Sequence, residues 1–239
     1  MFIKKFMSEL VLMVEFIFML THHDVTIPNA LEVFEEVKDT GLKFIGCKDV
    51  GLSLDKLKEL FNRMKKADMI TFLEVVTYSE EEHFRGVETA IAVQADYLIG
   101  GMPWFFEKTR QYLKEKKAGI KYFPYIGKIE DHPCILKGSV EDIIKNGIEF
   151  EEKSVDGINL LLYRYVGDQK ELLNQIVERL HVPIIVAGSI DSFEKIDQLK
   201  EKDKCIWAFT IGGAILEKKF VRDGDIRDQI LAVLRHIRS

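Results

Sequence analysis

The sequence lacks several features that mark specialised classes of protein. It has only three cysteines, Cys47, Cys134 and Cys205, and no CxxC pair, so we expect neither a disulfide framework nor a cysteine-rich zinc site. No basic run or basic helix face stands out in a chain of net charge −5, which argues against nucleic acid as a partner. No linker or low-complexity segment interrupts it either. We therefore predict one domain over residues 1–239.

Long apolar runs are also scarce. Lys4 and Lys5 precede an apolar run that ends at Leu20, as in a signal peptide. However, Glu9 and Glu15 interrupt that run, and no small-residue cleavage site follows it. No other segment has about 18 uninterrupted apolar residues, the length that crosses a membrane. We therefore expect a cytoplasmic protein with no membrane partner, in which a short N-terminal helix precedes a first buried strand.

What the sequence has is a regular alternation of short apolar runs and amphipathic stretches. The predicted strands are Glu15–Leu20, Leu42–Cys47, Ile70–Val76, Tyr97–Ile99, Lys121–Tyr125, Gly157–Leu162, Pro183–Ala187 and Ala208–Ile211. The predicted helices are Asn29–Asp39, Leu54–Ala67, Glu80–Gln94, Trp104–Lys117, Val140–Asn146, Gln169–Leu180, Phe193–Glu201 and Ile226–Ile237. Residues that favour helix starts precede five of them: Ser53, Ser79, Ser139, Asp168 and Ser192.

These elements form eight βα units. Continuous apolar runs suit strands that are covered on both faces, as in a parallel sheet. Eight right-handed crossovers in a chain of this length close into a (β/α)8 TIM barrel of the α/β class. A doubly wound open sheet is the alternative, but it usually has fewer strands, and no GxGxxG follows the first strand.

Glycine ends the last two predicted strands. Gly188 and Ser189 follow the seventh strand, and Gly212 and Gly213 follow the eighth. Glycine lets a ligand approach the backbone, and the corresponding loops of a barrel, with a short extra helix, commonly bind phosphate. We predict a phosphate site there; the alternative is that these glycines only form tight turns.

At these residues the chain resembles the ribulose-phosphate-binding barrel superfamily. That group includes the phosphoribosyl isomerases of histidine synthesis, thiamin-phosphate synthase and prenyltransferases that act on glycerol phosphate. The resemblance is specific only around residues 183–216, and it implies phosphate binding at Gly188, Ser189, Gly212 and Gly213. Some members have Gly-Gly after the seventh strand where this chain has Gly188-Ser189. The isomerases also use an aspartate on the fifth strand, which this chain lacks.

Candidate catalytic residues lie at the ends of the early strands, where barrel enzymes carry their chemistry. Lys48 and Asp49 directly follow the second strand, and Gly51 follows them in a turn, so we expect the strand to have ended and both side chains to face the barrel mouth. A lysine against the barrel wall can act as a base or form an imine, and an adjacent carboxylate can exchange protons with it. Glu74 sits inside an apolar strand, where a carboxylate needs a partner, and Lys48 is the natural one. The alternatives are a solvated Lys48, a helix-capping Asp49 and a purely structural ion pair.

Two further residues are candidates. His22, followed by His23 and Asp24 at the end of the first strand, could act as an acid or base or bind substrate. Arg164, after the sixth strand, could bind an anionic group, although a surface arginine is an equal alternative. The histidines lack the spacing of a metal-binding motif, so we expect no metal and no other cofactor.

We therefore expect an enzyme that acts on a small phosphorylated metabolite, of lyase, aldolase or isomerase type. Phosphate would be bound at the last two loops, with Lys48, Asp49 and Glu74 across the barrel mouth. The alternative function is a non-catalytic barrel that binds a phosphorylated ligand and signals to a partner. The sequence leaves homo-oligomerisation open.

Overall fold

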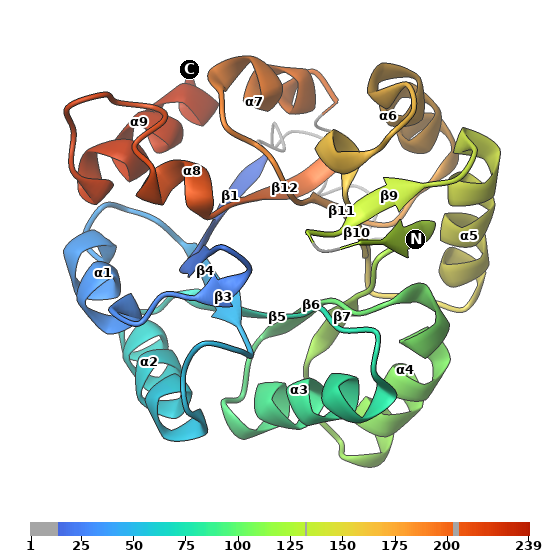
Figure 1. The fold of residues 1–239 in the computed structure, drawn as a ribbon, viewed down its shortest axis with the longest axis horizontal. Coiled ribbons are helices and arrows are strands. Elements are labelled where there is room, and N and C mark those ends of the chain that lie inside the picture. The colour runs from blue at the N-terminus through green and yellow to red at the C-terminus, as the bar shows by residue number, and fades with distance from the viewer. Residues whose placement is uncertain (1–13, 132, 203–205) are drawn as a thin grey trace, which may run out of the picture.

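A parallel sheet of eight strands forms the centre of the molecule (Figure 1). The computed structural model describes residues 14–131, 133–202 and 206–239. The strands are β1 (Glu15–Met19), β4 (Phe44–Lys48), β5 (Ile70–Val75), β6 (Tyr97–Gly100), β7 (Lys121–Phe123), β10 (Ile158–Leu160), β11 (Ile184–Val186) and β12 (Ile206–Ile211). Their order is β10-β11-β12-β1-β4-β5-β6-β7, and a parallel bridge between Tyr125 and Asn159 joins the two ends. The predicted TIM barrel is therefore confirmed.

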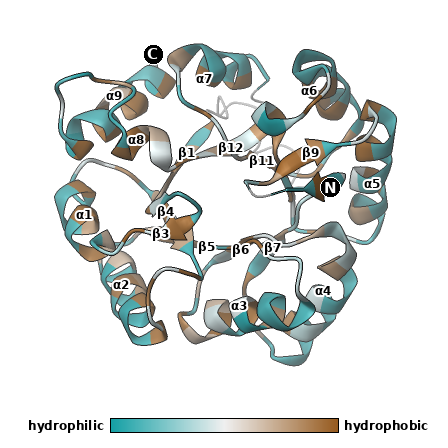
Figure 2. Ribbon diagram, viewed as in Figure 1, coloured by the Kyte–Doolittle hydropathy of each residue, from teal (hydrophilic) through white to brown (hydrophobic). Residues whose placement is uncertain are grey.

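Helices surround this barrel, each following a strand. They are α1 (Ala30–Val37), α2 (Leu54–Lys66), α3 (Glu80–Ala92), α4 (Phe106–Glu115), α5 (Val140–Glu152), α6 (Gln169–Arg179), α7 (Phe193–Lys200) and α9 (Ile226–Arg238). Figure 2 shows hydrophilic residues mainly on the helix sides that face away from the barrel. The apolar sides bury the outer surface of the sheet, which explains why the strands are apolar on both faces.

The predicted helix-start residues mostly act as caps. The side chains of Ser53, Ser79 and Ser139 each accept a hydrogen bond from a backbone N–H in the first turn, and Asp168 accepts two. Each such cap typically contributes about 1 kcal/mol. Ser192 occupies the N-cap position of α7, but its side chain makes no capping hydrogen bond.

One helix is longer than the sequence predicted. The prediction ended at Asn146, whereas α5 continues to Glu152. Gly147 lies inside the helix, where Leu180 packs closely against it. A Cβ at position 147 would lie only 2.7 Å from Leu180 Cδ1, so a larger residue would clash. The glycine therefore allows a close approach of the chain beyond α6, and it does not end the helix.

Side chains fill the N-terminal half of the barrel. The inner cluster consists of Ile17, Met19, Phe44, Phe72, Ile99, Phe123, Ile185 and Ala208, with Tyr97 and Trp207 packed against it. The Phe72 and Tyr97 rings stack with their centroids 4.6 Å apart, and Trp207 lies 5.2 Å from Tyr97. Truncating a buried ring such as Phe72 to alanine would cost about 3–5 kcal/mol. Because this half is packed, a ligand can enter only from the C-terminal end.

Short extra elements cluster at that C-terminal end. They are the strands β2 (Thr21–His22), β3 (Val25–Thr26), β8 (Lys128–Glu130) and β9 (Ile135–Lys137), the 3-10 turns η1 (Pro103–Phe105) and η2 (Leu162–Arg164), and helix α8 (Gly213–Leu216). Each follows the end of a barrel strand. The N-terminal helix predicted before Glu15, and Cys205, lie outside the described residues. Among the described helices, none has the length and apolar character required to cross a bilayer.

Candidate functional site

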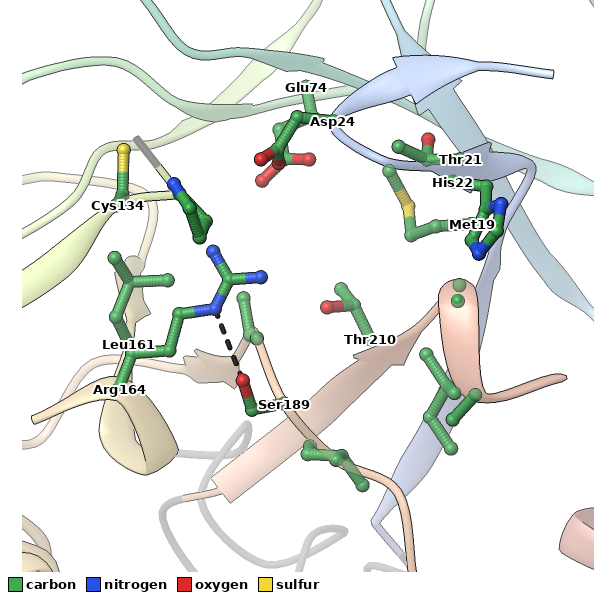
Figure 3. Close-up of a pocket in the computed structure, with 18 of the residues that line it drawn as sticks. Met19, Thr21, His22, Asp24, Glu74, Cys134, Leu161, Arg164, Ser189 and Thr210 are labelled. Carbon is green, nitrogen blue, oxygen red and sulfur yellow. Dashed lines mark hydrogen bonds between the residues drawn. The ribbon is translucent and has the colours of Figure 1, made fainter. Parts of the chain in front are cut away.

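A pocket of about 450 Å³ opens at the C-terminal end of the barrel (Figure 3). Residues from both glycine-ended loops line one side, and Lys48, Glu74 and Asp24 line another. The pocket therefore contains Gly188, Ser189, Gly212, Gly213, Arg164 and His22 of the predicted site, together with Lys48 and Glu74. Asp49 is the one predicted site residue that does not line it.

Lys48 is the buried cation of this pocket. Its side chain ends β4 pointing into the barrel, and the residue is only 5% exposed. Its Nζ donates to Asp24 Oδ1 at 2.8 Å and lies 4.0 Å from Glu74 Oε2. The backbone is fixed as well, because the Thr26 hydroxyl accepts from the Lys48 N–H and donates to the Lys48 carbonyl. The predicted Lys48–Glu74 pair is present, with Asp24 as the nearer partner.

The two carboxylates keep Lys48 charged. Burial lowers the pKa of the Lys48 ammonium, but the negative charges of Glu74 and Asp24 more than offset it, so the net pKa is raised. The lysine is therefore protonated at neutral pH in the unliganded protein. A protonated ammonium can polarise a carbonyl oxygen or donate a proton, whereas imine formation would first require its deprotonation.

A tight turn brings Asp24 to the mouth. His23 and Asp24 join β2 to β3, and both have positive φ, of 48° and 63°. Such angles are those of a two-residue hairpin turn, and histidine and aspartate are among the residues that adopt them most readily after glycine and asparagine. The turn fixes the Asp24 carboxylate beside the Lys48 ammonium.

Tyr125 holds the other carboxylate. Its hydroxyl donates to Glu74 Oε1 at 2.8 Å. Burial and the charge of Glu74 raise the pKa of the Tyr125 phenol well above its ordinary value, so it remains protonated. Glu74 therefore contacts a donor on each side, Tyr125 and the Lys48 ammonium. This arrangement orients its carboxylate in the pocket.

Asp49 lies on the opposite side of the strand from Lys48. We predicted that the strand ends early enough for both to face the mouth, and the structure does not agree. The Asp49 N–H donates to the Glu74 carbonyl, so the sheet pattern continues and the side chains alternate. The Asp49 carboxylate faces Gly86 of α3, where a Cβ would lie 2.7 Å from Asp49 Oδ2. Burial raises the pKa of Asp49 to about 6.

The two glycine-ended loops form a cup at the pocket edge. Gly188 and Ser189 both have positive φ, of 81° and 59°. Gly212 precedes α8, and a Cβ there would lie 2.6 Å from the Thr21 carbonyl oxygen. The first N–H groups of a helix have no partner within it. The start of α8, at Gly213, can therefore offer its backbone N–H to a ligand.

Arg164 extends into the pocket from η2 (Figure 3). Its Nε donates to the Ser189 hydroxyl at 3.3 Å. A Cβ at Gly188 would lie 2.8 Å from Arg164 Nε, so the glycine makes room for the arginine. The sequence predicted both residues as binding groups but not this contact between them. Arg164 places a permanent positive charge beside the cup.

His22 lies on the other side of the cup. Its Nε2 is 3.0 Å from Glu217 Oε1, and its ring contacts that of His23 with centroids 3.8 Å apart. Gly213 packs on the His22 ring, with a Cβ there lying 3.5 Å from Cδ2. In the described ranges, no group of three or more histidine, cysteine, aspartate or glutamate side chains could hold a metal ion.

Sequence reasoning missed several residues that line the pocket, among them Tyr125, Cys134 and Thr210. Tyr125 and Thr210 each lie two positions after an inward-facing residue of the chain. Because side chains alternate between the two faces of a strand, this spacing indicated that both face the inside of the barrel. Cys134 is buried in the hairpin between β8 and β9, where burial raises the pKa of its thiol. No pattern in the sequence indicated that this hairpin reaches the barrel mouth.

No model of a known protein family matches this sequence, and no curated protein matches it. Solved structures do resemble it. Thiamine phosphate pyrophosphorylase from Pyrococcus furiosus is 15% identical, with a TM-score of 0.63 over 95% of this chain and 96% of that one. N-acetylmannosamine-6-phosphate 2-epimerase from Clostridium perfringens is 15% identical, with a TM-score of 0.61 over 95% of each chain.

A third similar structure is that of an enzyme–substrate complex. (S)-3-O-geranylgeranylglyceryl phosphate synthase from Thermoplasma acidophilum, in complex with sn-glycerol-1-phosphate, is 11% identical. Its TM-score is 0.63 over 94% of this chain and 92% of that one. At such identities the likeness concerns the fold. The chain thus has the TIM-barrel fold of these enzymes, as its eight predicted βα units indicated.

Proposed function

We propose that this protein is an enzyme that acts on a small phosphorylated metabolite with a carbonyl group, by proton transfer of the isomerase, lyase or aldolase type. One observation carries the proposal. The glycine-ended loops and the cluster of Lys48, Glu74, Asp24 and Tyr125 line different sides of one pocket. A ligand fixed at one end by its phosphate would present its carbons to the cluster at the other.

The phosphate would be bound by Gly188, Ser189, Gly212 and Gly213, with charge supplied by Arg164. Backbone N–H groups at the start of a helix and a guanidinium group are the usual donors to phosphate. His22 would contact the phosphate or the carbon next to it. The similarity to enzymes named for phosphorylated substrates supports this assignment.

The chemistry would take place between Lys48 and Glu74. The Glu74 carboxylate would accept a proton from the carbon beside the carbonyl, and the electron pair left behind would form an enolate. The Lys48 ammonium would stabilise the enolate oxygen, and Tyr125 would keep Glu74 oriented. Returning the proton to a different carbon or face gives an isomer. In an aldol cleavage the carboxylate would instead take the proton of a hydroxyl group on the second carbon from the carbonyl; the bond between the two carbons would break, its electron pair would form the enolate, and the enolate would then be protonated. Asp49 lies outside the pocket, so this proposal gives it no direct contact with substrate.

Proton exchange with solvent tests this reaction class before the exact product is known. Phosphorylated metabolites that raise the melting temperature would be incubated with the protein in D2O, and NMR would follow loss of the proton beside the carbonyl. We expect exchange with wild type and a loss of about a hundredfold or more with Glu74→Gln. Glu59→Gln, on the exposed face of α2, is the matched control and should exchange normally.

The alternative of a non-catalytic sensor makes a different prediction in the same experiment. A sensor would be stabilised by its ligand without exchange or turnover. For a sensor, wild type and Glu74→Gln would both show no proton exchange, and the substitution would change ligand stabilisation only as far as it changes ligand affinity. Exchange that is equal in Glu74→Gln and wild type would also contradict the role proposed for this carboxylate.

A further inference from the structure

Asn159, in the middle of β10, is a buried polar residue without a partner. Its exposed fraction is 0%, and neither Nδ2 nor Oδ1 has a hydrogen-bond partner among the described residues. Its neighbours Ile158 and Leu160 belong to the cluster outside the barrel, so Asn159 points inward. A buried amide with no partner is destabilising and rare, and an oxygen atom from outside the protein would satisfy it.

The strand register places Asn159 directly below the pocket. Inward-facing side chains of a barrel stack in layers drawn from alternate strands. Here the pairings put Asn159 in one layer with Thr210, Gly46 and Ile99. Thr210 lines the pocket, and Gly46 has no side chain, because Phe72 and Met19 occupy the place where its Cβ would lie. The layer therefore combines an amide, a hydroxyl and a small residue where barrels normally have apolar side chains.

The next layer toward the C-terminal end of the barrel also lines the pocket. On the strands that flank Asn159, its members are Ala187 and Tyr125, and both line the pocket. Ala187 contributes only a methyl group. A single layer, thin on one side, thus separates the Asn159 amide from the pocket.

We propose that Asn159 and Thr210 form a subsite for a neutral hydroxyl-type oxygen at the bottom of the pocket. The Asn159 amide offers both donors and an acceptor, and the Thr210 hydroxyl offers one of each. A hydroxyl group or a water molecule matches this set. Neither side chain is charged, so the subsite suits such an oxygen better than a phosphate. In the liganded protein the oxygen is a hydroxyl group of the ligand, and in the free protein it is water. The identity of that ligand as a phosphorylated metabolite rests on the proposed function.

A crystal structure with ordered water resolved tests the subsite itself. We expect an oxygen within about 3 Å of the Asn159 side chain, which is hydrogen-bond distance. Finding instead that the amide bonds only to protein groups, with no other oxygen beside it, would overturn the proposal. This result does not depend on whether the protein binds phosphate.

Calorimetric titration with Asn159→Leu tests the ligand. The probes are inorganic phosphate, which fills the cup alone, and ribose 5-phosphate, ribulose 5-phosphate and glycerol 1-phosphate, which add hydroxyl groups. We expect the variant to bind the best of these phosphate esters about tenfold more weakly and inorganic phosphate as before. Tyr122→Phe is the matched control. It also removes a buried hydroxyl without a partner among the described residues, but lies outside the barrel and should change no affinity.

Protein stability separates a binding role from a structural one. If the amide exists for a ligand, Asn159→Leu should unfold at the same or a higher urea concentration than wild type, because the amide makes no hydrogen bond within the protein that the substitution could remove. A variant that is less stable, with unchanged affinities, would overturn the binding role. Unchanged ester affinity with an oxygen visible beside Asn159 would assign that oxygen to water and overturn the ligand contact. Failure of wild type to bind inorganic phosphate would contradict the proposed function, while the crystal structure would still decide the subsite.

Discussion

Replacing Lys48 with methionine should destabilise the protein through the two carboxylates that it leaves behind. Methionine keeps the unbranched buried stem and removes only the charge. Lys48 Nζ lies 2.8 Å from Asp24 and 4.0 Å from Glu74. At an effective dielectric constant of about 20, these separations correspond to attractions of about 6 and about 4 kcal/mol, most of which the burial of the ammonium offsets.

The net cost should be about 3 kcal/mol. Removing one partner of a buried ion pair typically costs about 3–5 kcal/mol, and the low end applies because the Asp24 side chain remains 21% exposed. For a chain of this size, that corresponds to a fall in Tm of roughly 6–12 °C. Urea unfolding at neutral pH, followed by circular dichroism, would measure it.

A surface ion pair of similar length provides the control. Lys38 Nζ lies 2.7 Å from Glu35, but both side chains are more than a third exposed. Lys38→Met should therefore leave the unfolding midpoint almost unchanged. If Lys48→Met costs no more than Lys38→Met, the argument that burial makes the Lys48 cluster a strong interaction is wrong.

The pH dependence gives a second check on Lys48. Its pKa is raised in the folded protein, so its stabilising contribution is complete below the ordinary lysine pKa of about 10.4. The contribution is lost as the pH rises through the folded-state value. The difference in unfolding free energy between wild type and Lys48→Met should thus be constant near neutrality and should shrink in alkali. A difference that already falls between pH 6 and 8 would contradict the charged state of Lys48.

Three further changes test other parts of the account. Tyr125→Phe removes the donor to Glu74 and should reduce proton exchange about tenfold with little loss of phosphate affinity; an equal loss in both would indicate a general disruption. Gly188→Val puts a Cβ at a position with φ of 81° and 2.8 Å from Arg164, so titration should show loss of phosphate binding, and retained affinity would remove this loop from the cup. Asp49→Asn should stabilise the protein at pH 8 but not at pH 4. Burial raises the pKa of Asp49 from 3.8 to about 6, so the cost of its charge accumulates as the pH rises between these two values and is complete above about 6; equal effects at both pH values in urea unfolding would contradict this.

The barrel was predictable because each of its eight strands, and each helix that covers them, carries its own periodic signal; the short elements β2, β3, β8 and β9 carry none. Helix-start residues such as Ser53 and Asp168 agreed with the apolar pattern, and local signals of this kind fix element types well. The end of α5 was not predictable from Gly147, because its role depends on contact with Leu180, which is distant in sequence.

The site was predictable only in part. Lys48 and Glu74 are charged residues in or at the end of apolar strands, and that contradiction is visible in the sequence. The orientation of Asp49 depended on where the ladder with β5 ends, which strand alternation alone does not determine. The positions of Cys134 and Asn159 depend on a hairpin and on the register between strands, and both are properties of the closed barrel.

The most direct test of the central claim is a crystal structure of the protein soaked with inorganic phosphate. The account predicts phosphate density between Ser189 and Gly213, with Arg164 within hydrogen-bond distance and Lys48 still paired with Asp24 across the pocket. Two results would contradict the account. One is an empty cup together with a melting temperature that added phosphate does not raise; the other is phosphate bound only elsewhere on the protein.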